Sequence, residues 1–78
     1  MRGYAHDNPY QKERTVLGKT IRDIREKNGL TQEALADKAE IDVSYLAKIE
    51  NGYVNTTVRY LIKISRALGV KAKDLLPF

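Results

Sequence analysis

The strongest constraint on the fold lies at residues 32–51, where two short helical segments are separated by a turn of three residues. Thr31 precedes the first segment and Asp42 the second, and side-chain oxygens of such residues accept the free backbone N–H groups at a helix start. A turn this short makes the helices meet at a steep angle. Their crossing requires a small residue, and Ala36 has that position. The apolar residues spaced to lock the pair are Leu35, Ala39, Ile41, Leu46 and Ile49.

The rest of the chain is also predicted to be helical. A first helix at residues 15–27 has apolar residues at the helical spacing, and Asn28-Gly29 ends it because both residues tolerate a left-handed conformation. A fourth helix begins after Thr57 and ends at Gly69, and a final helical turn is expected at residues 71–76. The predicted buried stripe of the fourth helix is Val58, Leu61, Ile62, Ser65 and Leu68.

These segments predict an all-α fold, a compact domain of five helices over residues 15–78. Residues 1–14 are polar and aromatic without a helical apolar period, so we expect a flexible N-terminal arm there. The chain has no cysteine, and its single histidine is His6, so we expect neither a metal nor another cofactor. No apolar run approaches the roughly 20 residues that span a bilayer, and the N-terminus lacks the apolar stretch of a signal peptide, which predicts a cytoplasmic location.

The positive charge is unevenly placed along the chain. The formal net charge of +4 arises mainly in residues 53–78, which carry five basic side chains and one acidic side chain. Residues 40–52 instead carry one basic and three acidic side chains. A uniform basic coat for a polyanion would not show this distribution, so any nucleic acid must be contacted by selected residues.

The pair of helices at residues 32–51 predicts DNA binding, because a helix-turn-helix unit places its second helix in the major groove. The expected base contacts are Val43, Ser44, Ala47 and Lys48, on the solvent side of that helix. Lys48 is a donor suited to guanine, whereas Val43 and Ala47 suit a thymine methyl group. Lys48 could instead be an ordinary solvated lysine.

The segment from Gly29-Leu30-Thr31-Gln32 through Tyr45-Leu46 and Ile49-Glu50-Asn51-Gly52 to Leu75-Leu76 resembles the XRE family of helix-turn-helix proteins, the Cro and phage-repressor type. The resemblance covers residues 15–78. It implies a five-helix, lambda-repressor-like domain that regulates transcription by binding double-stranded DNA, usually as a homodimer on a palindrome. Two positions depart from the family: Glu40 occupies a turn position usually held by glycine, and Thr56 one often held by proline.

The resemblance also assigns roles to single residues. Gln32 and Tyr45 match positions that contact bases or the DNA backbone, although Tyr45 could pack over the second helix instead. Arg25 and Glu50 match a structural ion pair between the first and third helices. Backbone contacts are expected from Thr31, Asn51, Tyr53, Asn55, Thr57 and Arg59. Arg59, Lys63 and Arg66 form one basic stripe, for which a solvated face is favoured at Lys63 and Arg66, whereas Arg59 could equally contact DNA or be solvated.

Two further expectations concern partners. Apolar residues concentrate near the C-terminus, which predicts a homodimer whose contact is formed by Val70, Leu75, Leu76 and Phe78. The principal functional hypothesis is a repressor or autoregulator. The alternative is an antitoxin or adaptor whose helix-turn-helix domain also docks a protein partner. No constellation of residues supports an enzyme.

Overall fold

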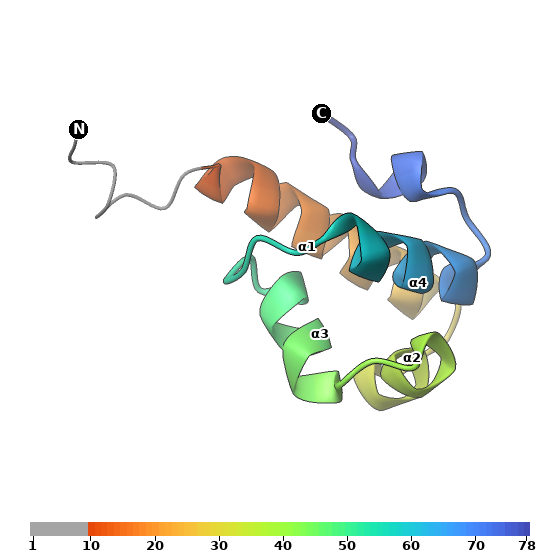
Figure 1. The fold of residues 1–78 in the computed structure, drawn as a ribbon. Helices are drawn as coiled ribbons and strands as arrows, with labels where there is room; N and C mark the ends of the chain where they lie inside the picture. The colour runs from red at the N-terminus through yellow and green to blue at the C-terminus, as the bar shows by residue number, and fades with distance from the viewer. Residues whose placement is uncertain (1–9) are drawn as a thin grey trace.

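The computed structural model describes residues 10–78, so residues 1–9 of the predicted arm, including His6, lie outside the described part. This part contains no strand. Its elements are α1 (Gln11–Lys27), α2 (Gln32–Ala39), α3 (Val43–Glu50), α4 (Val58–Leu68) and a short 3-10 helix, η2 (Ala72–Leu75) (Figure 1). The all-α prediction is confirmed, with four α-helices and a 3-10 helix in the place of the fifth.

Three of the helices begin at the predicted caps. The Thr31 hydroxyl accepts the backbone N–H of Ala34 at 3.0 Å, and the Asp42 carboxylate accepts that of Ser44 at 3.1 Å. Thr57 caps α4 in the same way through the N–H of Tyr60. Because each cap satisfies a donor that the helix itself leaves free, these short-range bonds set the starting points of α2, α3 and α4.

The first helix begins four residues earlier than predicted. Gln11–Arg14 form the first turn of α1 rather than the end of an arm. The Arg14 side chain is buried, and its Nε donates to the carbonyl oxygen of Gly52 at 3.1 Å, while Gln11 bonds Thr15 across one turn. A contact with the loop after α3 therefore stabilises a helical turn that has no apolar period of its own.

The core lies where the helices meet. The largest fully buried side chains are Ile21, Leu35, Leu46, Ile49, Ile64 and Leu75. Helix α1 packs against α3 and η2, while α4 packs against α2 and η2. The α2–α3 pair therefore lies on one side of α1 and α4, and η2 lies on the other (Figure 1). Helices α1 and α4 therefore support α2 and α3 from the same side.

Helix α4 presents a different face to the core than predicted. Val58 is 71% exposed and Ile62 is at the border of exposure, whereas Ile64 and Ala67, absent from the predicted stripe, are buried. The buried face is centred on Ile64, Ser65 and Leu68, with Leu61 partly covered. The prediction for Val58 and Ile62 was therefore wrong, because the apolar residues of α4 cover a wide arc of which α2 and η2 bury only one side.

The C-terminal segment also corrects the predicted dimer contact. Leu75 is fully buried in the core, so it is not available to a second chain, and Val70 is partly buried against the same core. Leu76 and Phe78 are exposed. The backbone N–H of Lys71 donates to the Asp74 carboxylate at 3.0 Å, which closes the single turn of η2.

Candidate nucleic-acid interface

The turn between α2 and α3 has the geometry that a steep helix crossing requires. Ala36 is buried at the crossing, and its carbonyl oxygen accepts the N–H of Ile41 at 2.9 Å. Glu40 ends α2 in the left-handed region, with a φ of 57°. A residue other than glycine costs about 1 kcal/mol there. Glu40 thus adopts the conformation for which the family usually has glycine, and the turn retains its shape despite this cost.

Helix α3 presents a small solvent face beside this turn. Its inner side is formed by Leu46 and Ile49, which are almost fully buried. The α3 solvent face, defined here as Val43, Ser44, Ala47 and Lys48, is exposed except for the half-buried Ala47. All four predicted base-contacting residues thus lie on one face. With three small side chains and one cation, this face can enter a groove about 12 Å wide.

Tyr45 lies at the edge of α3 and packs toward α4. Its ring centroid is 4.6 Å from that of Tyr60, and its hydroxyl donates to Thr56 Oγ1 at 3.4 Å. The side chain is half-buried, and its ring partner comes from α4. Tyr45 therefore ties α3 to the loop before α4, and a contact with DNA remains a prediction for its exposed part.

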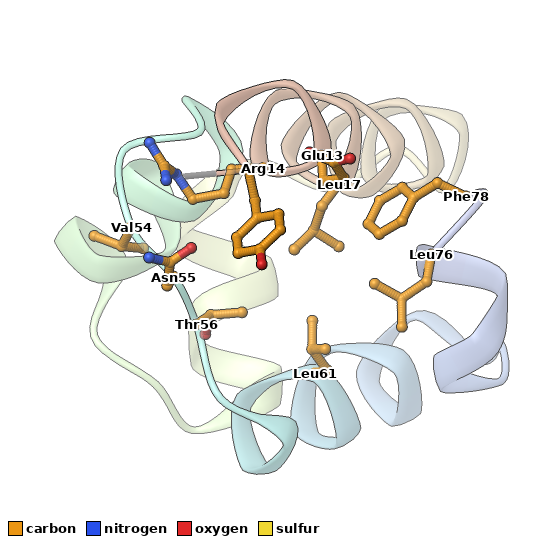
Figure 2. Close-up of a pocket in the computed structure, with 10 residues that line it drawn as sticks. Glu13, Arg14, Leu17, Val54, Asn55, Thr56, Leu61, Leu76 and Phe78 are labelled. Atoms are coloured by element: carbon orange, nitrogen blue, oxygen red, sulfur yellow. The ribbon is translucent and has the colours of Figure 1, made fainter. Parts of the chain in front are cut away.

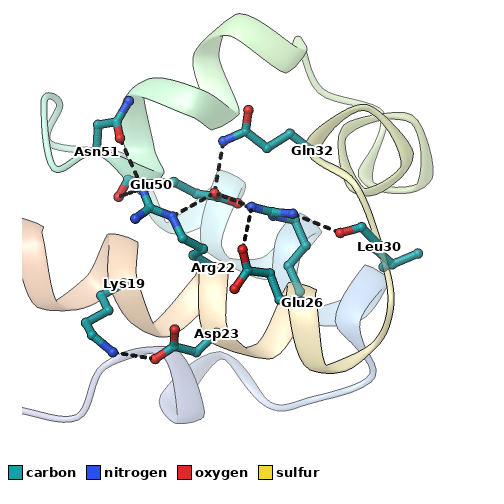
Figure 3. Close-up of polar contacts among 9 residues, drawn as sticks. Lys19, Arg22, Asp23, Glu26, Leu30, Gln32, Glu50 and Asn51 are labelled. Atoms are coloured by element: carbon teal, nitrogen blue, oxygen red, sulfur yellow. Dashed lines mark hydrogen bonds and ion pairs between the residues drawn. The ribbon is translucent and has the colours of Figure 1, made fainter.

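A buried carboxylate at the C-terminal end of α3 joins three helices (Figure 3). Glu50 is 3% exposed, and its two oxygens accept from Arg25 Nε at 2.7 Å and Arg25 Nη2 at 3.0 Å. Gln32 Nε2 donates to Glu50 Oε1 at 2.9 Å. The predicted pairing of Arg25 with Glu50 is present, and it also holds the predicted DNA-contacting residue Gln32 at the start of α2.

The charge state of Arg25 follows from this pairing. Its hydrogen bond to Glu50 raises the pKa of the guanidinium above its ordinary value, although burial opposes the shift. A raised pKa stabilises the fold at every pH below the ordinary value of arginine, and this contribution is lost only as the pH rises through the folded-state value. Arg25 therefore stays charged throughout the neutral range.

One member of this site was missed by the sequence analysis. No role was predicted for Arg22 of α1, but its Nη2 donates to Asn51 Oδ1 at 3.0 Å and to the Glu50 carbonyl at 3.2 Å. Its position three residues before Arg25 puts both side chains on one helix face. That spacing is the signal that could have indicated a second arginine at the end of α3.

The predicted backbone-contacting residues come from the start of α2, the loop after α3 and the first turn of α4. All six side chains are exposed: Thr31, Asn51, Tyr53, Asn55, Thr57 and Arg59. The hydroxyls of Thr31 and Thr57 already accept cap bonds, so their remaining capacity toward a phosphate is as donors. Four of the six lie in the loop that joins α3 to α4.

Within residues 10–78, the structure supports neither a metal site nor a membrane-spanning helix. Their His, Cys, Asp and Glu side chains nowhere gather in threes that could hold a metal ion. None of their helices combines the length and apolar character needed to cross a membrane.

Comparison with known proteins agrees with this geometry. Residues 21–75 match the model of the helix-turn-helix family HTH_3, and the chain belongs to this XRE-type family. It is a DNA-binding transcriptional regulator, as its relatives are.

The relatives include two control proteins. C.BamHI of Bacillus amyloliquefaciens is 41% identical over 66 residues, which cover 83% of this chain and 82% of that protein. C.MunI of Mycoplasma sp is 37% identical over 60 residues, 76% of this chain and 81% of that protein. Among solved structures, the restriction-modification controller protein C.AhdI from Aeromonas hydrophila matches with a TM-score of 0.82 and 29% identity, over 83% of this chain and 98% of that one.

Proposed function

We propose that the protein regulates transcription, as a repressor or autoregulator, by inserting α3 into the major groove of a palindromic operator. The observation that carries this proposal is the α3 solvent face, where Val43, Ser44, Ala47 and Lys48 stand together above a buried Leu46–Ile49 side. Such a helix reads base edges directly, while residues around it contact phosphates. Selection of bound sites from a random DNA library tests it, and recovery of a two-fold symmetric sequence is the expected result.

The relatives support a more specific role. C.BamHI and C.MunI are named control proteins, and C.AhdI is a restriction-modification controller. We therefore propose that this chain controls the expression of genes of a restriction-modification system. The antitoxin or adaptor alternative is not favoured, because these relatives are regulators of similar length to the matched segment.

Lys48 is proposed to read a guanine within each half-site. Lys48→Ala should weaken binding to the selected site by about 1–3 kcal/mol and remove the preference for guanine at one position of each half-site. Fluorescence anisotropy against a panel of single-base variants measures both effects.

The matched control is Lys73→Ala, which removes the same charge from an exposed position on η2, away from α3. It should leave base preference unchanged. If Lys48→Ala bound every DNA of the panel more weakly by the same factor and kept the preference for guanine, Lys48 would contact a phosphate instead of a base.

A homodimer is proposed to complete the operator-binding unit. Its support is the exposed apolar surface at the C-terminal end, where Leu76 is 38% and Phe78 is 63% exposed. Both line a hollow of ≈ 250 Å³ together with Leu17 and Leu61 (Figure 2). A small monomer rarely leaves such side chains grouped in water. Two-fold pairing would place two α3 helices about 34 Å apart, one turn of DNA.

Sedimentation equilibrium tests the dimer. The chain of 8.9 kDa should sediment with about twice that mass at tens of micromolar, and Leu76→Ser with Phe78→Ser should shift it toward the monomer. Lys73→Ser, an exposed position on the preceding helix η2, should leave the mass unchanged. A wild-type monomer that binds a single half-site would contradict the proposed dimer.

The same proposal covers location and chemistry. A regulator of this kind acts where the chromosomal DNA is, so we propose a cytoplasmic location. Binding through α3 requires no cofactor and no catalytic step, and we propose neither.

A further inference from the structure

Arg22 is held in place at the junction of α1 and α3. Its Nη2 donates to Asn51 Oδ1 and to the carbonyl oxygen of Glu50, and its Nε is 3.5 Å from Glu50 Oε1. The side chain nevertheless keeps 39% of its surface exposed. A guanidinium with fixed orientation and an open side is suited to bind an anion from solvent, since its conformational entropy is already reduced.

The charge of Arg22 is poorly compensated by its surroundings. Both oxygens of Glu50 are engaged by Arg25 at 2.7 and 3.0 Å, and Gln32 adds a third bond to this carboxylate. In the part of the chain that the structure describes, Glu50 is the one carboxylate within 4.0 Å of Arg22, at the longer distance of 3.5 Å. Two arginines thus share one buried carboxylate, and the surplus positive charge lies on Arg22, the more exposed of the two.

The neighbours of Arg22 are the predicted backbone-contacting residues. Asn51 is bound to it directly, and Gln32 shares the Glu50 carboxylate with it (Figure 3). Because Asn51 Oδ1 accepts from Arg22, its amide nitrogen is the end left to donate elsewhere. Donors from α1, the start of α2 and the residue after α3 are therefore gathered around the Glu50 carboxylate, at the C-terminal end of α3.

We propose that Arg22 binds a backbone phosphate of the DNA whose bases α3 contacts. This inference rests on the proposed function and adds a contact from α1, an element to which no DNA contact was assigned. The competing explanation is that Arg22 only caps the C-terminal end of α3, where a cation is favourable. The two explanations differ in one measurable respect, because a phosphate contact releases counterions from DNA and a helix cap does not.

The salt dependence of binding to the selected site is the test. With Arg22→Ala, the slope of log Kobs against log salt concentration should decrease in magnitude by about 0.9, the contribution of one phosphate of duplex DNA. The ratio of wild-type to variant affinity should consequently fall by about 3.5-fold between roughly 0.05 and 0.2 M salt. Arg22→Lys should restore the slope because it restores the charge, and Arg22→Gln, which keeps a donor, should behave as Arg22→Ala.

Lys19→Ala is the matched control, because Lys19 is an exposed cation on the same helix that pairs with Asp23. It should leave the slope unchanged. Replacing duplex phosphates one at a time by uncharged methylphosphonates should reveal a position that weakens the wild type but not Arg22→Ala. A slope for Arg22→Ala and Arg22→Gln equal to that of the wild type, or an equal decrease for Lys19→Ala, would overturn the inference. Failure of the wild type to select any sequence would instead contradict the proposed function.

Discussion

Replacing Glu50 by alanine should lower the free energy of unfolding by about 3–5 kcal/mol, because it leaves a largely buried arginine without its counter-ion. The carboxylate is inaccessible to water, and the Arg25 side chain is only 10% exposed. The same substitution removes the bond from Gln32 and the contact from Arg22. Since domains of this size are stable by about 5–15 kcal/mol in total, a substantial part of the fold's stability would be lost.

Urea denaturation followed by circular dichroism measures this loss. The control is Asp23→Ala, which breaks the exposed Lys19–Asp23 pair and should change stability by less than about 1 kcal/mol. The double variant Arg25→Met with Glu50→Leu should recover part of the stability, because it removes both buried charges together. A change for Glu50→Ala no larger than that of Asp23→Ala would mean that the ion pair makes little contribution.

The helix starts could be predicted because their causes are local. Thr31, Asp42 and Thr57 each accept an N–H from a residue two or three positions ahead, so the pattern is visible in a few letters of sequence. The α3 solvent face was predictable for the same reason. Once Leu46 and Ile49 are assigned to the core, the helical period places Val43 and Lys48 outside.

The start of α1 and the role of Arg22 depend on residues far along the chain. Arg14 bonds the carbonyl of Gly52, 38 positions away, and Arg22 bonds Asn51 across 29 positions. The sequence does not mark Gly52 or Asn51 as an acceptor, because one accepts through its backbone carbonyl and the other through a single side-chain amide. Only the crossing of α1 with α3 brings these groups together, so helical period and capping rules could not indicate them.

The errors at α4 and at the C-terminus have a related cause. Amphipathic spacing indicates that a helix has an apolar side, but the neighbouring elements decide how much of that side is covered. Here η2 supplies Leu75 to the core against α4, while Val58 and Ile62 stay outside it. The packing of Tyr45 could not be predicted for the same reason, since its ring partner Tyr60 comes from α4 and not from the second helix.

Gly18→Ala is expected to destabilise the fold by about 2–3 kcal/mol, even though alanine is the better helix former by about 1 kcal/mol. A Cβ at this position would lie 2.5 Å from the carbonyl oxygen of Ile49 and nearer still to that of Glu50. Both atoms belong to the backbone of the last turn of α3, which cannot rotate away as a side chain would. The two helices would have to separate, and the Glu50 carboxylate would move with α3.

Gly29→Ala provides the matched comparison, because an added Cβ there meets no atom within 4 Å although φ is +72°. Its cost is the strain of a left-handed residue, about 1–2 kcal/mol. Urea denaturation of both variants distinguishes the cost of backbone strain, at Gly29, from the cost of a steric clash between α1 and α3, at Gly18. Gly18→Ala should also weaken binding to the selected DNA by more than the unfolded fraction of the protein explains, because displacement of α3 alters the spacing between Lys48 and Gln32. Gly29→Ala should bind with the wild-type affinity once folded. A Gly18→Ala protein as stable as the wild type would show that α1 and α3 can separate without cost, and that the close crossing does not set the position of α3.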